Sequence, residues 1–226
     1  MIQVAYARIR ELTPIELARL PADEREREFE NGDRRRQFFC GRWLLRTMLE
    51  RRGHQLAARR DVNMAEHGKP FINGGPPFSI AHAGDLVACC TADSGDVGID
   101  LEFTDSERNI EGVAKRYFSA DEVEWLAAQP EDRFFMLWVL KESWVKALGL
   151  SIFGNMDEPR FRVDPPEIAA THDEGRARNQ VLFGLDNAYF AIAASDRLPN
   201  DIVVERWEDT TDSFVTDDKA QLVART

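Results

Sequence analysis

Cysteines and long apolar runs are both scarce in this sequence. Only three of its 226 residues are cysteines, and Cys89 and Cys90 are neighbours, a spacing that rarely makes a structural disulfide. We therefore expect a reducing compartment, the cytoplasm. No stretch approaches the roughly 18 apolar residues of a membrane-spanning helix, and the first residues lack the apolar region of a signal peptide. The sequence predicts neither a membrane protein nor an exported one.

An overall basic excess is also missing, because the formal net charge is −11. A general nucleic-acid-binding protein carries the opposite balance, so nucleic acid is not expected as a partner. The charge is unevenly spread, however. Residues 34–60 contain nine arginines and a single acidic residue, Glu50. Such a segment is either a solvated helix face or a surface that attracts a polyanion, and the sequence leaves both interpretations open.

The composition, 43% hydrophobic and 31% charged, is that of a water-soluble globular protein with one large core or two smaller ones. Residues 33–52 have the apolar spacing of a helix with a buried face and a basic outer side. Residues 78–82 and 86–93 favour a hairpin that turns at Gly84, and residues 97–103 a further strand.

The second half continues with the same kinds of element. Ser119 is expected to begin a helix in which Glu122 completes a capping box. No sequence repeat stands out. We expect further helices at 109–116 and 133–148, strands at 160–163, 180–184, 188–194 and 202–207, a polar loop at 165–178, and a loosely held tail at 209–226.

This order of elements predicts an α+β fold with two similar lobes, each made of antiparallel strands packed on helices and related by a pseudo-twofold axis. The turn at residues 94–96 is the candidate junction. Residues 1–95 would form the N-terminal lobe and residues 96–226 the C-terminal lobe. Both halves of a cleft would then come from one chain, so we expect a monomer.

Two carboxylates are expected to share one face of the strand at 97–103. Side chains alternate along a strand, so Asp100 and Glu102 point the same way while Leu101 points into the core. Hard cations such as Mg²⁺ are held by one to three carboxylates together with water and phosphate oxygens. Surface strands also carry such pairs without any metal, so the pair alone is weak support for a metal site.

A second polar stripe lies on the helix expected at 133–148. Trp138, Glu142 and Lys146 follow one another at intervals of four residues and so lie along one face. A surface Glu–Lys pair would account for them, with a stabilisation of about 0.2–0.5 kcal/mol. The apolar residues around them argue against open solvent, and a partly buried carboxylate and ammonium require a functional reason.

Lys69 and Pro70 form a stiff turn that resembles a phosphate-binding loop but does not match one. Asn63 stands where the first glycine of that loop belongs, and Pro70 replaces its hydroxyl residue. Lys69 nevertheless offers a fixed positive charge for one phosphate group. Ser79 and His82 belong to the strand that follows, and both could donate to the same anion, although each also has a structural explanation.

Five motifs in order resemble the signature of the 4′-phosphopantetheinyl transferases of the Sfp type. The resemblance covers about residues 34–151, and its most specific elements are GID-x-E and W-x-x-KE-x-x-x-K. It implies a two-lobed enzyme that transfers the phosphopantetheine arm of coenzyme A to a serine of an apo acyl or peptidyl carrier protein, with release of adenosine 3′,5′-bisphosphate. The motifs are GKPF (68–71), FSIAHAG (78–84), VGIDLE (97–102), RYFSADEVEWL (116–126) and WVLKESWVKALG (138–149).

The resemblance also assigns roles to residues. It implies that the N-terminal lobe contacts the coenzyme's 3′-phosphate and that the C-terminal lobe carries the metal ligands and the catalytic helix. Alanines flank His82 where many members have serines, which would weaken a hydrogen bond without touching the metal. The implied ligands of Mg²⁺, or Mn²⁺, are Asp100, Glu102 and Glu142; the catalytic residues are Glu142 and Lys146; the coenzyme contacts are Arg42, Arg46, Lys69, Pro70, Ser79, His82 and Lys141.

Two other functions stay open at this point. A non-catalytic homologue that only binds coenzyme A or the carrier protein would be recognised by the loss of a metal ligand or of Lys146, and none is lost. A phosphatase or nucleotidyl enzyme could use the same carboxylates on an unrelated phosphate ester. Within the transferase interpretation, the proton acceptor is Glu142 or a cation-bound water that it orients.

Overall fold

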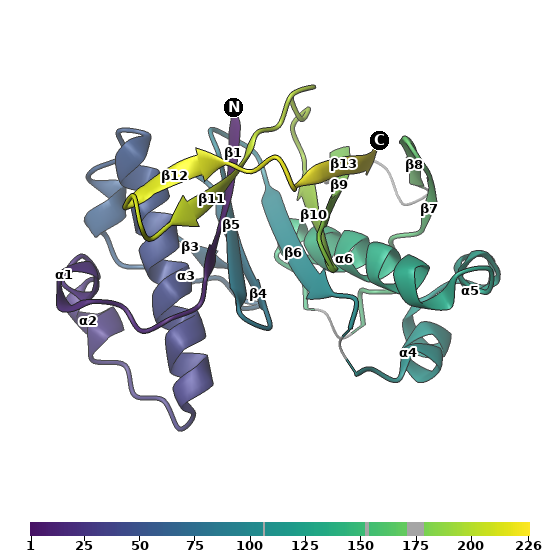
Figure 1. The fold of residues 1–226 in the computed structure, drawn as a ribbon, viewed down its shortest axis with the longest axis horizontal. Coiled ribbons are helices and arrows are strands. Elements are labelled where there is room, and N and C mark those ends of the chain that lie inside the picture. The colour runs from purple at the N-terminus through teal and green to yellow at the C-terminus, as the bar shows by residue number, and fades with distance from the viewer. Residues whose placement is uncertain (106, 152–153, 171–178) are drawn as a thin grey trace.

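The molecule consists of four layers, helix, sheet, sheet and helix, and Figure 1 shows the long helices on its two outer sides. The computed structural model describes residues 1–105, 107–151, 154–170 and 179–226. Helix α3 (Gly32–Arg51) covers the outer face of one sheet, and α6 (Pro130–Leu148) covers the outer face of the other. The predicted α+β fold with two similar lobes is confirmed.

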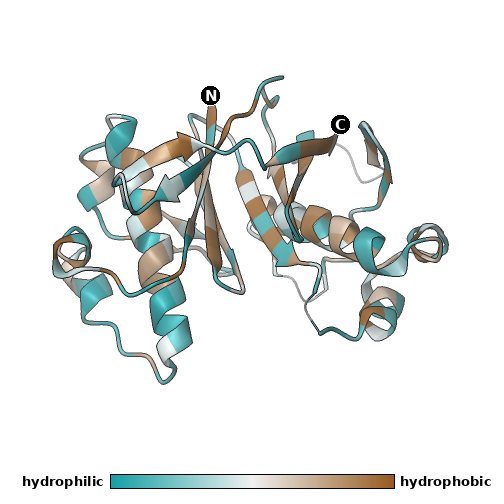
Figure 2. Cartoon of the chain, viewed as in Figure 1, coloured by the Kyte–Doolittle hydropathy of each residue, from teal (hydrophilic) through white to brown (hydrophobic). Residues whose placement is uncertain are grey.

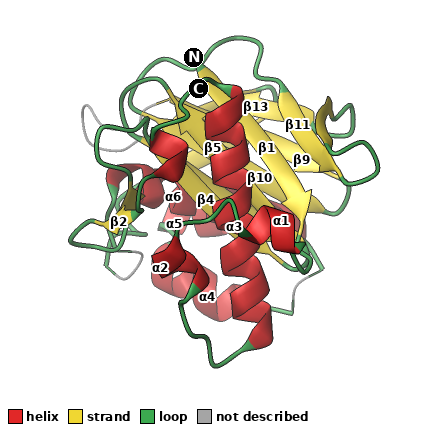
Figure 3. Cartoon of the chain, turned by 90° about the vertical axis from the view of Figure 1, so that its left-hand side faces the viewer, coloured by secondary structure: helices red, strands yellow, loops and turns green. Residues whose placement is uncertain are grey.

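The first sheet belongs mainly to the N-terminal half. Its five strands have the order β12-β11-β1-β5-β4, and β4 and β5 form the predicted hairpin. In Figure 3, which looks at this side of the molecule, α3 crosses in front of the strands. The strands are β1 (Ile2–Arg8), β4 (Phe78–Ala83), β5 (Leu86–Ala92), β11 (Val204–Glu208) and β12 (Ser213–Thr216); the other elements of this lobe are α1 (Pro14–Leu17), α2 (Ala22–Arg25), the 3₁₀ turn η1 (Ala57–Arg59) and the small hairpin β2 (Asn63–Met64) and β3 (Pro70–Phe71).

The second sheet has six strands in the order β6-β10-β9-β13-β8-β7. It is antiparallel except where β13 pairs with β8. Two short helices precede α6 and pack against it. The strands are β6 (Val97–Phe103), β7 (Phe161–Asp164), β8 (Glu167–Ala170), β9 (Asn179–Leu185), β10 (Ala188–Ala194) and β13 (Gln221–Arg225); the helices are α4 (Ile110–Tyr117) and α5 (Ala120–Leu126).

The inner faces of the two sheets share one apolar core. Val4 and Cys90 from the first sheet lie in the same buried cluster as Ile99 and Phe190 from the second. Figure 2 shows the strands between the two long helices as largely hydrophobic. The edge strands β4 and β6 also meet through a hydrogen bond, in which the backbone N–H of Ile99 donates to Ser79 Oγ at 3.1 Å. The lobes are therefore joined by packing and by a polar contact.

Glycines fix both the position and the end of α6. At Gly98 of β6, a methyl group would overlap the carbonyl oxygen of Ser143 and the backbone nitrogen of Ala147, so only glycine lets the helix lie this close to the strand. Gly149 ends the helix in the left-handed conformation, with φ 65°. At the other side, Ser119 and Glu122 form the predicted capping box of α5. These local features place Glu142 of α6 beside β6.

The prediction of a loosely held tail is wrong. Strands β12 and β13 lie within residues 209–226, and the two belong to different sheets. Phe214 packs on Trp207 with ring centroids 5.0 Å apart, and Ala224 is fully buried. The acidic residues between these apolar positions obscured their alternation. The polar loop expected at 165–178 is replaced in part by β8, and residues 171–178 lie outside the described residues.

The sheets do not follow the division at residue 95 throughout the chain. β11 pairs in parallel with β1, and β12 pairs with β11, so residues 204–216 belong to the first sheet. The chain then returns to the second sheet through β13. A boundary drawn along the sequence cannot describe this exchange. Among the described residues, none of the helices is both long and apolar enough to cross a membrane.

Candidate functional site

Three carboxylates converge between β6 and α6. Asp100, Glu102 and Glu142 each offer one oxygen, and these oxygens lie within 4.8 Å of one another, close enough to share one ion. The strand supplies two of them because its side chains alternate, and the helix supplies the third from the turn that packs nearest to Gly98. Lys146, one turn further along α6, donates to Asp100 and lies 3.4 Å from Glu142.

The electrostatics of the cluster reflect burial of like charges. Desolvation, and then the nearby Glu142, raise the pKa of Asp100 well above its usual value. Burial also raises the pKa of Glu102, against the opposing effect of Arg108. Burial alone would lower the pKa of Lys146, but the charges of Asp100 and Glu142 outweigh it and the pKa is raised. Asp100 and Glu102 are thus harder to ionise than free carboxyl groups, whereas Lys146 stays protonated.

The donor set fits a hard divalent cation. Asp100 is only 3% exposed, and its Oδ2 atom is buried without a hydrogen-bond partner among the described residues. Such an acceptor is costly unless something satisfies it. Carboxylate oxygens are the ligands that Mg²⁺ and Mn²⁺ prefer. The orphaned oxygen of Asp100, beside two further carboxylates, is therefore what a cation site of this kind requires.

Arg108 and Trp138 complete the cluster, and sequence reasoning missed the first of them. Arg108 donates to Glu102 Oε1 at 2.6 Å, and its guanidinium carbon lies 5.1 Å from the centroid of the Trp138 ring. The ring itself is only 8% exposed. Arg108 follows β6 in a connecting segment without any motif of its own, so no spacing pointed to it.

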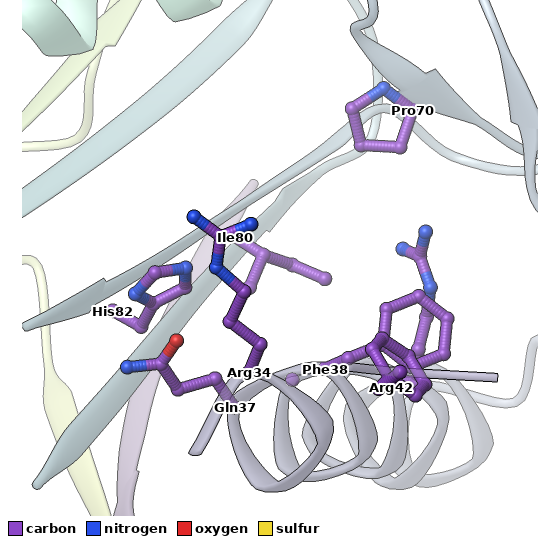
Figure 4. A pocket seen from close by; sticks show the side chains of 9 residues that line it. Arg34, Gln37, Phe38, Arg42, Pro70, Ile80 and His82 are labelled. Carbon is purple, nitrogen blue, oxygen red and sulfur yellow. The ribbon is translucent and has the colours of Figure 1, made fainter. Parts of the chain in front are cut away.

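A cavity of about 480 Å³ lies between α3 and β4. Figure 4 shows Arg34, Gln37 and Arg42 rising from the helix, with His82 on the strand opposite. Pro70 closes another part of the wall. Of the two arginines that the resemblance offered, only Arg42 lines this cavity. Arg34 and Gln37 were missed, although they are three residues apart and therefore neighbours on one face of α3.

Two predicted coenzyme contacts lie elsewhere. Arg46 is 1% exposed, pairs with Glu24 at 2.8 Å and donates to the carbonyl of Ala58 at 2.6 Å. Lys141 is fully buried, pairs with Glu122 at 3.0 Å and donates to two backbone carbonyls. Their donors are engaged inside the protein, away from the cavity. We therefore remove Arg46 and Lys141 from the candidate coenzyme contacts.

Lys69 and Ser79 sit where the two lobes meet. Lys69 reaches from the hairpin to α6, where its ammonium donates to the carbonyl of Ala147 and lies 3.7 Å from Asp96. Burial lowers the pKa of Lys69. Ser79 is buried, with its hydroxyl accepting from Ile99. In this structure both residues make contacts between the lobes.

His82 connects the cavity with the carboxylate cluster. It lines both the cavity beside α3 and a second groove of about 690 Å³, which also includes Glu102 and Arg108. Partial desolvation, and then the positive charge of Lys146, lower the pKa of His82. Gln37 likewise borders both hollows. The two hollows therefore adjoin, and together they run from the arginines of α3 to Glu102.

Comparisons with known proteins agree with this site. A family model described as the 4′-phosphopantetheinyl transferase superfamily matches residues 96–194, which include all three carboxylates. The chain is 31% identical over 189 residues to the 4′-phosphopantetheinyl transferase HetI of Nostoc sp., with 79% of each chain covered. It is 33% identical over 155 residues to a 4′-phosphopantetheinyl transferase of Bacillus subtilis, covering 65% of this chain and 68% of that protein. The transferase gsp of Aneurinibacillus migulanus is 36% identical over 92 residues, 39% of this chain and 38% of that one.

Proposed function

This chain belongs to the 4′-phosphopantetheinyl transferase superfamily, and we propose that it transfers the 4′-phosphopantetheine group of coenzyme A to a serine hydroxyl of an apo acyl or peptidyl carrier protein. The observation that carries the proposal is the convergence of Asp100, Glu102 and Glu142, with Lys146 beside them. Adenosine 3′,5′-bisphosphate would be the second product. The reaction depends on a divalent cation, Mg²⁺ or Mn²⁺, held by the three carboxylates.

The cavity beside α3 suits the nucleotide end of the coenzyme. Arg34 and Arg42 present two guanidinium groups, which bind phosphate through paired hydrogen bonds, and His82 adds a donor on the opposite wall. Phe29 and Phe38, whose ring centroids are 5.1 Å apart, supply apolar surface for a base. Lys69 is close to the junction and could exchange its contact with Ala147 for a phosphate oxygen.

Transfer requires the negative charge on the diphosphate oxygens of coenzyme A to be neutralised, because it repels the attacking serine oxygen. A bound divalent cation would neutralise the developing negative charge on the phosphate oxygens. In this proposal Glu142 accepts the proton of the attacking serine hydroxyl, directly or through a cation-bound water that it orients. As the serine oxygen forms its bond to phosphorus, the bond to the bridging oxygen breaks, and the protonated Lys146 stabilises that leaving oxygen.

The test is mass spectrometry of an apo carrier protein incubated with the chain, coenzyme A and Mg²⁺. We expect the carrier to gain one phosphopantetheinyl group. Glu142→Gln should lower the rate by roughly 100-fold or more, because it removes a metal ligand and the proton acceptor together. Glu131→Gln is the matched control, since Glu131 is exposed on the same helix.

No gain of mass on several carriers of different pathways would overturn the proposal. A non-catalytic coenzyme A or carrier-binding homologue would instead bind without transfer. The retained carboxylates and Lys146 favour catalysis over that alternative, because a binding protein has no need of a buried acceptor such as Asp100 Oδ2. Turnover of a simple phosphate ester without any carrier would favour a phosphatase.

The partner would approach a local positive field. Carrier proteins that are acidic around the modified serine would be attracted by the arginines of α3, at rates that fall with salt. Both hollows of the site come from one chain, so the proposed state is a monomer. All three cysteines are free and buried, which suits a cytoplasmic protein.

A further inference from the structure

Arg108 bridges a metal-ligand candidate and an aromatic ring in a way that the transfer mechanism does not use. Its guanidinium donates to Glu102 Oε1 at 2.6 Å and stacks over Trp138 at 5.1 Å. Trp138 belongs to the W-x-x-KE-x-x-x-K motif, yet the proposed transfer mechanism gives it no role. We propose that Trp138 and Arg108 position Glu102 for cation binding, an inference that rests on the proposed function for its metal site.

The Trp138 ring is held in place by the core, and it in turn restricts the position of the Arg108 side chain. Trp138 is only 8% exposed and stacks on Phe134, with ring centroids 5.8 Å apart, so its ring is held by the core of the C-terminal lobe. The Arg108 side chain is 28% exposed but lies over this ring. A cation over an indole face is attracted by about 0.5–2 kcal/mol, which limits the rotamers available to Arg108. The ring therefore supplies a platform from which Arg108 reaches Glu102.

Glu102 needs such guidance more than the other two carboxylates. Asp100 is held by Lys146 and is buried, and Glu142 lies on a rigid helix next to the same lysine. Glu102 is near the end of β6, and Arg108 provides the only ion pair that the described residues give it. Repulsion from Asp100 and Glu142 would otherwise turn its flexible side chain outward. Arg108 occupies only one of its oxygens and leaves the other for a cation.

Groups that hydrogen-bond a ligating carboxylate from outside commonly change metal affinity by about 10–100-fold. Arg108 is therefore a positioning residue, and its loss should weaken the cation without removing a ligand. Arg116 offers a matched control, because its guanidinium lies 5.1 Å from the Tyr117 ring but, among the described residues, it is given no carboxylate partner.

The experiment measures Mn²⁺ affinity of the coenzyme-free protein by electron paramagnetic resonance, so its result does not depend on transfer activity. Arg108→Gln should raise the dissociation constant by roughly 10-fold or more. Trp138→Phe should raise it by a smaller factor, and only when Arg108 is present. Arg116→Gln should leave it unchanged. Arg108→Lys should give an intermediate affinity, because it keeps the charge and loses the planar fork.

Equal or tighter Mn²⁺ binding by Arg108→Gln would overturn the inference, since Arg108 would then be a bystander or a competitor of the cation. If the effects of Trp138→Phe and Arg108→Gln on the Mn²⁺ dissociation constant were additive, Trp138 would not act through Arg108. That result would overturn the role proposed for Trp138. Thermal melting without metal checks that each variant folds, and Arg108→Lys serves as the second variant if Arg108→Gln does not. A wild-type protein that binds no Mn²⁺ would instead contradict the proposed metal site itself.

Discussion

The two lobes repeat one order of elements, but only one of them carries the carboxylates. β1, α1, α2, α3, the β2–β3 hairpin, β4 and β5 correspond in turn to β6, α4, α5, α6, the β7–β8 hairpin, β9 and β10. In both lobes the first strand pairs antiparallel with the last over its whole length. This register aligns the lobes residue by residue, although the overall sequences of the halves differ.

The alignment places alanines where the second lobe has its acids. Arg8 and Phe103 end the two ladders, so Ala5 corresponds to Asp100 and Ala7 to Glu102. Both alanines are buried against α3. Thr47 stands in the place of Glu142, and its hydroxyl donates back to the carbonyl of its own helix. At the positions where the C-terminal lobe has three carboxylates, the N-terminal lobe thus has small, uncharged side chains.

A buried ion pair, by contrast, is present in both lobes. Arg46 of α3 pairs with Glu24 of the preceding helix, and Lys141 of α6 pairs with Glu122 in the same relation. Each cation also donates to two backbone carbonyls. A feature that both lobes share serves the fold, whereas a feature confined to one lobe serves the site. On this basis Lys141, although it stands inside the most specific motif, is structural.

Gly98→Ala should have the largest effect on the free energy of unfolding. Its counterpart in the first lobe is Gln3, whose full side chain is accommodated, so the requirement for glycine belongs to one lobe only. A methyl group at Gly98 meets backbone atoms of α6 that cannot rotate away. We expect a loss of more than about 4 kcal/mol, or failure to fold, measured by urea denaturation.

Gln3→Ala is the control and should cost less than about 1 kcal/mol, the value of one ordinary hydrogen bond. Equal losses from Gly98→Ala and Gln3→Ala would break the distinction between the lobes at this position. If Gly98→Ala folds normally, α6 must lie further from β6 than the structure places it, and the carboxylates would not share one cation.

The paired buried cations should come next. Lys141→Met leaves the buried Glu122 without its cation, and we expect it to lower the free energy of unfolding by about 3–5 kcal/mol. Arg46→Met should cost less, because Arg42 still lies 3.2 Å from Glu24. Replacing Glu122 by Gln in the Lys141→Met background should recover much of that loss, because the uncompensated charge is gone. Chemical denaturation of the single and double variants measures both effects.

The affinity for coenzyme A shows whether Arg46 and Lys141 are structural residues or coenzyme contacts. A Lys141→Met protein of normal stability that binds the coenzyme poorly would return Lys141 to the binding site. It would also break the rule that features shared by both lobes are structural.

Much of the fold was readable from the sequence because its signals are local. The apolar spacing of α3 and α6, the capping box at Ser119 and the turn at Gly84 each depend on neighbouring residues. The carboxylate cluster was predictable for a similar reason, since alternation on β6 fixes Asp100 and Glu102, and the motif supplies Glu142. Convergence of the strand and the helix came from the family resemblance.

What escaped prediction depends on partners far away in the chain. The pairing of β11 with β1 joins residues about 200 positions apart, which no local pattern reveals. Arg46 and Lys141 look like ordinary polar positions until Glu24 and Glu122 are brought beside them. Two similar lobes were predicted, but the correspondence between their sequences was not found, because it is confined to scattered positions such as Phe39 and Phe134 or Trp43 and Trp138.

Asp100→Asn removes the charge that distinguishes this position from Ala5 in the N-terminal lobe, and it has the smallest expected effect. The N-terminal lobe has uncharged Ala5 at this place. We therefore expect the buried charge of Asp100 to destabilise the metal-free fold and a bound cation to offset this destabilisation. We expect Asp100→Asn to raise the free energy of unfolding of the metal-free protein at neutral pH by about 1 kcal/mol, as substitutions at strained sites often do. It should also abolish stabilisation by added Mg²⁺.

The pH dependence of stability tests independently whether the charge of Asp100 destabilises the metal-free protein. The pKa of Asp100 is raised in the folded protein above its usual 3.8, so the folded state holds the proton more tightly than the unfolded state does. Stability of the metal-free wild type should therefore fall as pH rises from about 4 toward the folded pKa of Asp100, while Asp100→Asn lacks this decline. The two proteins should be equally stable near pH 3 and diverge above it. Parallel curves from thermal melts across this range would mean that Lys146 compensates Asp100 fully, and that the charged lobe bears no cost that its uncharged counterpart avoids.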